Sequence, residues 1–148
     1  GASMTDTKVS NVKQGTVLTR TGTTLFNRDV LRNPENGTPE NKLILSSDYT
    51  YGDVGVNVQA TRFGEYTYNH PTLASRDQTF SAQWVVDLDV RYQLTRELGV
   101  NAGANNLFDT YPEKFKSFNQ VNGINRYGFI APAGASGAFY YVGLNYQF

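Results

Sequence analysis

Alternation of apolar and polar side chains, sustained over windows of about ten residues, is the feature that most constrains this chain. The windows lie at 43–51, 54–63, 84–94, 98–108 and 138–148, with a weaker one from Thr5 to Lys13. In 84–94, for example, Val86, Leu88 and Val90 share one face, and charged residues occupy the other. Because successive side chains of a strand point to opposite faces, the windows predict about six strands, each with an apolar and a polar face.

The connections between these windows are of two kinds. Gly52-Asp53 and Thr95-Arg96-Glu97 are short hairpin turns, whereas the segments near 14–41, 64–80 and 109–137 are long and rich in Asn, Gly, Pro and aromatic residues. In an antiparallel meander, alternate connections lie at the same end. The sequence therefore predicts an all-β, up-and-down meander with short turns at one rim and long loops at the other, which is the layout of an outer-membrane barrel.

A soluble β-sandwich or lipocalin-like binding module has the same period of two and stays open as an alternative. Strands of about ten residues, aromatic side chains near the strand ends, and polar groups on the second face favour the barrel. The polar positions are Asp87, Asp89, Arg91, Asn101 and Asn105, which we expect to face a lumen or a plug. The two alternatives differ in one respect: a sandwich shields Val86, Leu88 and Val90 with a second sheet, whereas a barrel presents them to lipid.

Charge and composition exclude several classes of function. Thirteen basic and thirteen acidic residues give a net charge of zero, so the chain has no excess positive charge to attract nucleic acid. The absence of cysteine excludes disulfides and thiolate metal sites. No apolar run is long enough for a transmembrane helix, and the first residues lack the pattern of a signal peptide. We expect Gly1 to Ser3 to be a cloning remnant.

No arrangement of residues indicates catalysis. Asp87 and Asp89 stand two apart on one strand face, about 7 Å from each other, a separation found between paired carboxylates in hydrolases. Lumen-facing charges explain them more simply. His70 is the only histidine and lacks partners for a metal site. We therefore expect no enzyme activity, no cofactor and no metal.

One segment resembles a known family. Gly103-Ala104-Asn105-Asn106-Leu107-Phe108-Asp109, followed by Tyr111-Pro112, is similar to the penultimate strand of TonB-dependent outer-membrane receptors. Thr61-Arg62-Phe63-Gly64 and the spacing of Trp84, Asp87 and Tyr92 extend the resemblance upstream. The resemblance implies that residues 4–148 are the C-terminal strands and external loops of a barrel of about 22 strands, without the N-terminal plug domain. A passive porin-like barrel is a further alternative, against which the Asn-Asn-Leu-Phe-Asp segment argues.

The resemblance also implies a function, a location and partners. Such receptors import scarce nutrients, such as iron chelates, cobalamin or glycans, across the bacterial outer membrane, and the C-terminus lies on the periplasmic side. Implied partners are outer-membrane lipid, the plug and upstream strands, the nutrient, and the TonB energy-transducing complex through the N-terminal region. The ending Tyr146-Gln147-Phe148 resembles the signal read by the barrel-assembly machinery, with Tyr146 and Phe148 as its aromatic positions.

Aromatic and basic residues of the long loops are the candidates for contact with the nutrient, because such side chains stack on and pair with aromatic or anionic ligands. The candidates are Tyr66, Tyr68, Arg76, Tyr111, Phe115, Phe118, Arg126, Tyr127 and Phe129. The alternative for each aromatic residue is that it packs against other loop residues above the rim.

Overall fold

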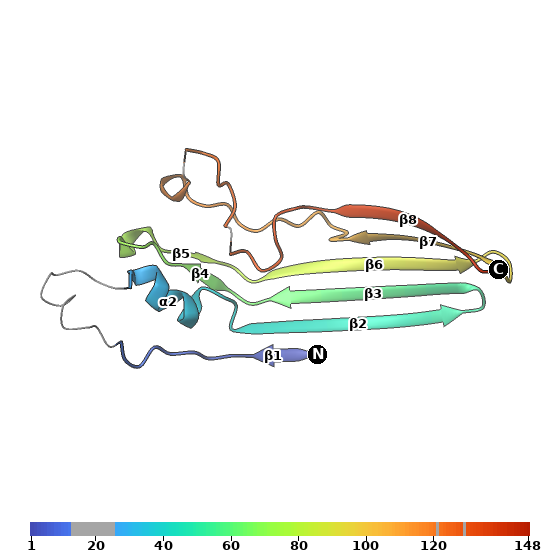
Figure 1. The fold of residues 1–148 in the computed structure, drawn as a ribbon, viewed down its shortest axis with the longest axis horizontal. Helices are drawn as coiled ribbons and strands as arrows, with labels where there is room; N and C mark the ends of the chain where they lie inside the picture. The colour runs from blue at the N-terminus through green and yellow to red at the C-terminus, as the bar shows by residue number, and fades with distance from the viewer. Residues whose placement is uncertain (13–25, 121, 129) are drawn as a thin grey trace, which may run out of the picture.

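One antiparallel sheet dominates the computed structural model, which describes residues 1–12, 26–120, 122–128 and 130–148 (Figure 1). Its strands are β1 (Ala2–Met4), β2 (Asn41–Tyr51), β3 (Val54–Phe63), β6 (Gln83–Gln93), β7 (Leu98–Asn105) and β8 (Phe139–Tyr146). They lie in the order β1-β2-β3-β6-β7-β8, and each pairs antiparallel with its neighbour. The predicted fold class, an antiparallel meander of six strands, is confirmed.

Short turns and long loops lie at opposite ends of the sheet, as predicted (Figure 1). The β2–β3 turn is closed by Gly52, whose φ of 56° is readily adopted by glycine. In the β6–β7 turn the backbone amides of Leu94 and Thr95 both donate to the carbonyl of Leu98, at 2.8 and 3.0 Å. The C-terminus lies at this short-turn end (Figure 1).

The long loops contain elements that the sequence did not predict. These are helix α2 (Arg28–Asn36), the hairpin of β4 (Tyr66–Tyr68) and β5 (Gln78–Phe80), and two 3-10 turns, η1 (Ala74–Arg76) and η2 (Ser117–Asn119). All are short, and all lie at the loop end of the sheet (Figure 1). None of the helices among the described residues has the length and apolar character needed to cross a membrane.

The prediction of a strand between Thr5 and Lys13 is wrong for residues 5–12, and residue 13 lies outside the described residues. The strand here is β1, which pairs Ala2–Met4 with Leu43–Asn41. The amide of Thr5 makes one more bond, to the Glu40 carbonyl at 2.7 Å, and the chain then runs past the end of β2. Among the described residues no strand lies beside residues 6–12 to pair with them, so an alternating pattern alone is insufficient.

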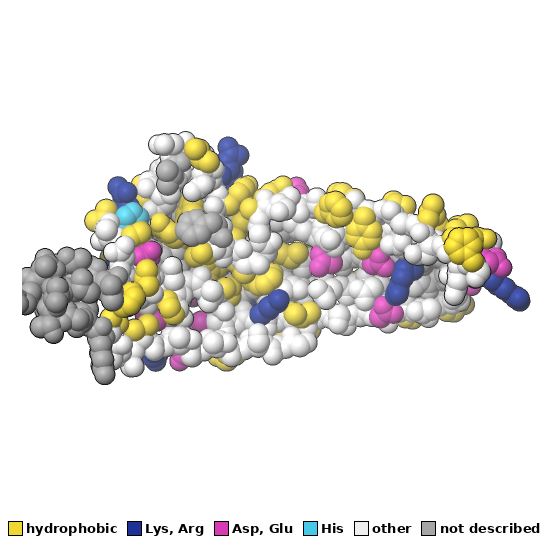
Figure 2. All heavy atoms as spheres, in the orientation of Figure 1, with side chains coloured by type: hydrophobic (Ala, Val, Ile, Leu, Met, Phe, Trp, Pro, Cys, Tyr) yellow, Lys and Arg dark blue, Asp and Glu magenta, His cyan; other side chains and the backbone are white. Residues whose placement is uncertain are grey.

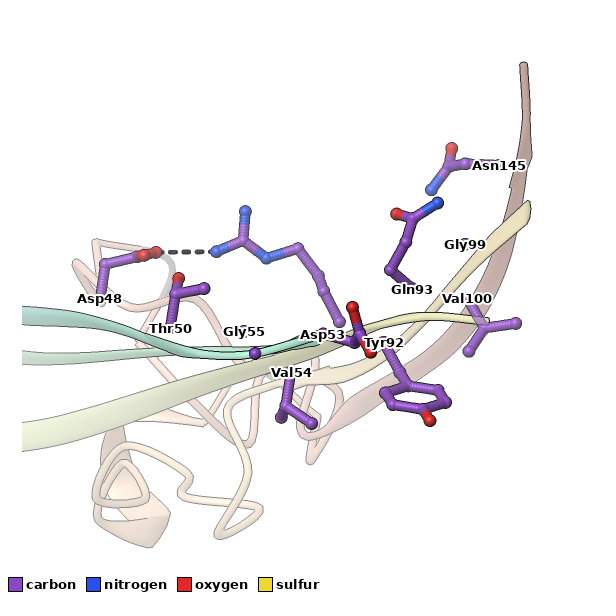
Figure 3. Close-up of a pocket in the computed structure, with 12 residues that line it drawn as sticks. Asp48, Thr50, Asp53, Val54, Gly55, Tyr92, Gln93, Gly99, Val100 and Asn145 are labelled. Carbon is purple, nitrogen blue, oxygen red and sulfur yellow. Dashed lines mark hydrogen bonds and ion pairs between the residues drawn. The ribbon is translucent and has the colours of Figure 1, made fainter. Parts of the chain in front are cut away.

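The strand register gives the sheet two chemically distinct faces. Directly opposed residues share a face, and one such row joins Val56, Val90, Ala102 and Val142 across four strands. The next residue along each strand belongs to the other face, where Asn57, Asp89, Gly103 and Tyr141 form the corresponding row. Figure 3 shows the separation near the short turns, with Asp48, Gln93 and Asn145 on one side of the sheet and Val54 and Val100 on the other.

The apolar face is largely open to its surroundings. Val142 is 82% exposed and Leu144 73%. The second sheet among the described residues, β4–β5, lies at the loop end and not over this face (Figure 1). The buried aromatic cluster lies instead among the loops, where Tyr66, Phe80 and Phe115 pack together. The sheet therefore has no core between two layers.

Candidate functional site

A network of charged and polar side chains crosses the polar face. The Asp48 carboxylate pairs with the Arg91 guanidinium at 2.8 Å and accepts a hydrogen bond from the Asn57 amide at 3.2 Å. Nε of Arg91 also lies 3.5 Å from Asp89, which accepts a hydrogen bond from the Tyr141 hydroxyl at 2.9 Å. The network links β2, β3, β6 and β8, and Figure 2 shows acidic side chains beside a basic one over the strands.

Glycines make room for this network. A Cβ at Gly55 would lie 3.4 Å from Nε of Arg91, and a Cβ at Gly143 would overlap the Asn101 side chain. At Gly103 a Cβ would overlap the ring of Tyr141. Each glycine is directly opposite the residue that covers it, so long side chains lie flat across the neighbouring strand.

The five residues predicted to face a lumen or plug all lie on the polar face. Asp89 and Arg91 belong to the network, and Asn101 lies over Gly143. Asp87 accepts a hydrogen bond from the backbone amide of Asn106 at 2.8 Å. Asn105 is exposed at the end of β7.

This face shows no arrangement for acid–base or metal chemistry. Both carboxylates of the Asp87–Asp89 pair are already engaged by donors of the protein. Within the described ranges, no three His, Asp or Glu side chains come close enough to hold a metal ion. A hollow of about 480 Å³ lies at the short-turn end, bordered by Asp48, Arg91, Gln93 and Asn145 (Figure 3). Its lining suits hydrogen bonding to a polar partner.

The Asn-Asn-Leu-Phe-Asp segment forms a turn at the end of β7. Asn106 has a φ of 54°, and its side chain donates to the Thr110 carbonyl at 2.8 Å and accepts from the Thr110 amide at 2.9 Å. Its backbone amide is the group that donates to Asp87. The Asn106 side chain is therefore committed to closing the turn, which supports a structural role for this segment.

The loops at the opposite end pack around an aromatic cluster. Tyr66 stacks on Phe80 with ring centroids 4.8 Å apart, and Phe115 meets Phe80 edge-on at 5.5 Å. The side chain of Gln78 is buried and pairs with the backbone of the loop as a neighbouring strand would. Its Nε2 donates to the Lys114 carbonyl, and its Oε1 accepts from the Lys116 backbone amide, both at 2.9 Å. The loop 109–137 is thus fastened to the β4–β5 hairpin.

Helix α2 is clamped to the same hairpin. Arg28 donates two hydrogen bonds to the carboxylate of Asp77, one of them from Nη1 at 2.6 Å, and also bonds the His70 carbonyl. The Arg28 bond holds the pKa of Asp77 below its usual value. Asn69 is fully buried and donates to the side chains of Asn33 and Asn36, at 3.3 and 2.7 Å. These bonds therefore join helix α2 to the connection between β4 and β5.

The structure separates the predicted ligand-contact residues into two groups. Tyr66 and Phe115 are 4% and 3% exposed and belong to the packed cluster, and burial raises the pKa of Tyr66 to about 12. Tyr68 is half-buried beside Phe115, with ring centroids 4.9 Å apart. These positions match the packing alternative.

The second group lies nearer the surface. Tyr111 stacks on Tyr127 with centroids 5.5 Å apart. The side chains of Arg76, Phe118 and Arg126 are exposed, and Phe129 lies outside the described residues. Of the predicted contact residues that the structure describes, Tyr111, Arg76, Phe118 and Arg126 are exposed, and Tyr127 is half-buried.

Several functional positions were not predicted. Arg28, Asn69 and Gln78 hold the loops together, but no local pattern indicated their partners, which lie 33 or more residues away. The place of Tyr141 could be predicted in part. The alternation in 138–148 puts it on the polar face with Gly143 and Asn145, and the register places it opposite Gly103.

Solved receptors share this fold. The structure is similar to part of a mutant of the ferric enterobactin receptor PfeA from Pseudomonas aeruginosa, with 23% identity and a TM-score of 0.55 over 75% of this chain and 16% of that chain. It is also similar to the ferripyoverdine receptor of the outer membrane of Pseudomonas aeruginosa, solved with ferripyoverdine bound, with 24% identity and a TM-score of 0.51 over 74% of this chain and 14% of that chain. A third structure, FpvAI in complex with a pyocin, matches with 24% identity and a TM-score of 0.50, over 75% of this chain and 14% of that chain.

The chain thus spans only 14–16% of the length of these receptors. No family model and no curated protein matches the sequence. At this level of identity the similarity establishes the fold alone, a six-stranded antiparallel sheet that matches part of each of these receptor structures. The resemblance carried by the Asn-Asn-Leu-Phe-Asp segment is confirmed to that extent.

Proposed function

We propose that this chain forms wall strands and external loops of a TonB-dependent outer-membrane receptor that imports a scarce nutrient. Residues 4–148 are its C-terminal portion in this proposal. The observation that carries it is the register of the sheet, which places an exposed apolar face on one side and an ion-paired polar face on the other. A barrel wall needs both faces, because one meets hydrocarbon and the other meets water or a plug.

The two faces then take different partners. Val58, Val142 and Leu144 contact lipid, and Asp87, Asp89 and Arg91 face the plug or the water-filled interior. The short turns and the C-terminus lie at the periplasmic rim, and the loop cluster lies outside the cell. A soluble sandwich would need a second sheet over Val86, Leu88 and Val90, and the described residues place their other sheet at the loop end.

The nutrient that the loops suit best is an iron chelate with aromatic or anionic groups. Tyr111 and Tyr127 supply stacked rings, and Arg126, the residue before Tyr127 in the sequence, supplies an exposed cation. Arg76 and Phe118 are further exposed candidates, and Phe129, outside the described residues, stays a candidate from the sequence alone. Tyr66, Tyr68 and Phe115 pack in the aromatic cluster of the loops. The similar receptors, one for ferric enterobactin and one for ferripyoverdine, favour the same class.

The remaining partners belong to the whole receptor. The plug and upstream strands complete the barrel, and the TonB complex acts through the N-terminal region. The barrel-assembly machinery reads the aromatic positions Tyr146 and Phe148, whose rings lie 5.2 Å apart at the short-turn end. Cobalamin and glycans are the other nutrient classes that such a receptor imports.

Light scattering and circular dichroism of the purified chain, with and without detergent, test the proposal. We expect a β-rich chain that is monomeric only in detergent or lipid and that forms oligomers in their absence. In water the apolar face exposes hydrophobic side chains, and the sheet edges expose unpaired backbone N–H and C=O groups. A cooperatively folded monomer without detergent would contradict the proposal and would favour a soluble binding module.

Binding of a ferric catecholate to the detergent-folded chain tests the nutrient class. Arg126→Gln is expected to weaken binding by roughly tenfold, the effect of losing one charge-assisted bond. Arg96→Gln is the matched control, since Arg96 lies in a short turn at the opposite end of the sheet. Equal loss in both variants would show that the loop surface is not the binding site.

A further inference from the structure

One arginine stands on the apolar face of the sheet. Arg62 of β3 is directly opposite Leu43 of β2 and Trp84 of β6, so these three side chains form one row. The preceding row on the same face contains Leu45, Ala60 and Val86. A guanidinium in such a position needs a physical explanation, because a cation on a lipid-facing surface is unfavourable near the middle of the membrane.

Arg62 makes no ion pair among the described residues. Its Nη1 donates to Oδ1 of Asn41 at 2.8 Å, and no carboxylate pairs with it within the parts of the chain that the structure describes. By contrast, Arg28 and Arg91 each pair with an aspartate. The guanidinium carries five N–H donors, so most of them are left for a ligand.

The Asn41 contact also fixes the direction of the guanidinium. The Asn41 side chain is confined by Gly64, where an added Cβ would lie 2.8 Å from its Oδ1. The amide of Gly64 in turn donates to the Asn41 carbonyl at 2.9 Å. An oriented guanidinium presents its remaining N–H pairs as a fork, the geometry that suits two oxygens of one phosphate.

The height of Arg62 on the wall fits a membrane boundary. Val54, at the short-turn end of β3, and Arg62 lie eight residues apart on the same face. At roughly 3.4 Å per residue they are about 27 Å apart along the strand, or about 20 Å across the membrane for a strand tilted by roughly 40°. The apolar band of such a wall is about 25 Å tall. With Val54 taken as the short-turn edge of that band, Arg62 lies about 5 Å inside its loop-side edge.

Trp84 marks the same boundary. It is 44% exposed, and its indole is directly opposite Arg62 in the register. Tryptophan is enriched where hydrocarbon meets lipid headgroups, because its ring is apolar and its N–H is polar. An aromatic ring and an unpaired guanidinium at one level form a surface for an anionic headgroup.

We propose that Arg62, with Trp84 beside it, binds the phosphate of an anionic membrane lipid on the outer surface of the wall. This inference rests on the proposed function, since it needs the apolar face in a bilayer. The lipid phosphate supplies the missing counter-charge, and its acyl chains lie along Leu43, Leu45 and Val86. The guanidinium reaches the headgroup by extending its alkyl chain toward the boundary.

Trp84 provides the probe for a test, because it is the only tryptophan in the chain. The chain is reconstituted in phosphatidylcholine bilayers containing a fixed fraction of brominated lipid, which quenches nearby indole fluorescence. The label is carried either by phosphatidylcholine or by phosphatidylglycerol. The ratio of the two quenching efficiencies gives the preference for the anionic lipid at the level of Arg62.

The unmodified chain is expected to prefer the anionic lipid by about fivefold, the effect of one basic side chain near an anionic headgroup. Arg62→Gln should reduce the ratio to about one, and Arg62→Lys should keep part of it, because the charge remains but the fork is lost. Arg96→Gln, which removes a cation at the opposite end of the sheet, should leave the ratio unchanged. Unchanged quenching by brominated phosphatidylcholine verifies that each variant is folded in the bilayer.

The outcomes separate this inference from the proposed function. Quenching of Trp84 by both labels with a ratio of one in the unmodified chain overturns the phosphate site and leaves the barrel wall standing. If neither label quenches Trp84, the apolar face does not contact lipid, and both the phosphate site and the proposed function are overturned. Millimolar inorganic phosphate is added as a further arm, and loss of the preference at that concentration would show a site for free phosphate and overturn the assignment to lipid.

Discussion

Gly103 lies directly beneath the phenol ring of Tyr141. The two residues are opposite each other in the β7–β8 register, and a Cβ at position 103 would overlap the ring and lie 2.6 Å from the Leu88 carbonyl oxygen. With no side chain there, Tyr141 crosses β7 and its hydroxyl reaches Asp89 on β6 at 2.9 Å. A missing side chain on one strand thus allows a hydrogen bond between its two neighbours.

Gly103→Ala is therefore expected to destabilise the sheet. The new methyl group must displace Tyr141 and strain the β6–β7 pairing, at a cost of about 1–3 kcal/mol. Urea unfolding of the detergent-folded chain, followed by circular dichroism, measures the change. Gly55→Ala is the control on the same face, because its Cβ would meet only the flexible Arg91 side chain at 3.4 Å. Equal stability of the two variants would contradict this role of Gly103.

Asp77→Asn is expected to loosen helix α2 from the β4–β5 hairpin. Exchange of the backbone amides near His70 should accelerate by roughly tenfold at pH 7, since a charged hydrogen bond is lost. Hydrogen exchange followed by mass spectrometry measures this. Asp53→Asn, in the short β2–β3 turn, is the control and should leave those amides unchanged. Unaltered exchange in Asp77→Asn would mean that Arg28 does not hold the loops together.

The same ion pair predicts a pH dependence. The pKa of Asp77 is lowered from its usual 3.8, chiefly by the hydrogen bond from Arg28. The stabilisation is therefore fully present above the usual pKa and is lost as the pH falls through the lower folded value. Amide protection near His70 should decline only below about pH 4 in the unmodified chain, and Asp77→Asn should show no such decline. Loss of protection already near neutral pH would contradict this assignment.

Tyr66→Phe is expected to be neutral or stabilising. The buried hydroxyl of Tyr66 has no hydrogen-bond partner among the described residues, so its removal relieves a desolvated polar group. We expect an unchanged stability, or a gain of about 1 kcal/mol, at pH 7. Tyr141→Phe, which loses the bond to Asp89, should be less stable. Thermal unfolding compares the pair, and a marked loss in Tyr66→Phe would reveal a partner for the hydroxyl.

Alkaline pH provides a second readout for Tyr66. Burial, with a smaller contribution from the charge of Glu113, raises its pKa from 10.0 to about 12. Because the folded state holds the proton more tightly, this group lowers stability as the pH rises from 10 towards 12. Tyr66→Phe should lose less stability over that interval than the unmodified chain, as measured by urea unfolding at each pH. Identical pH profiles would place the Tyr66 hydroxyl in water.

Gln78→Glu is expected to detach the loop 109–137 from the hairpin. The substitution replaces the donor that faces the Lys114 carbonyl with an acceptor at a buried position, at a cost of about 1–3 kcal/mol. Thr79→Ala, the next residue on β5, is exposed and should change stability by at most about 0.5 kcal/mol. Proteolysis of the loop reports the detachment, and equal resistance of both variants would contradict this role of Gln78.

The sheet could be predicted from sequence because its pattern is local. Strand β3 begins and ends at Val54 and Phe63, as the alternation and the Gly52-Asp53 turn indicated. Strand β7 ends at Asn105, three residues before the predicted end at Phe108, because Asn106 adopts a positive φ and closes a turn with Thr110. Alternation alone gives no signal for such a side-chain bond.

The loop cluster could not be predicted, because long-range contacts stabilise it. Helix α2 is nine residues long, which is too short to be stable alone, and it depends on Asn69 and Asp77 from another loop. Likewise, β4 and β5 have three residues each and are held in place by Phe115 and the backbone at Lys114. The sequence predicted that these aromatic residues lie in the long loops, but it left open whether each one contacts a ligand or packs against its neighbours.

The central claim is that the two faces of the sheet meet different media, and an accessibility scan along β6 tests it most directly. The chain has no cysteine, so single cysteines at positions 86 to 91 can carry a nitroxide label without interference. In bilayers, labels at Val86, Leu88 and Val90 should be relaxed by oxygen, which partitions into lipid, and labels at Asp87, Asp89 and Arg91 by a water-soluble nickel complex. A profile without this period of two, or protection of Val86, Leu88 and Val90 from both agents, would contradict the barrel wall.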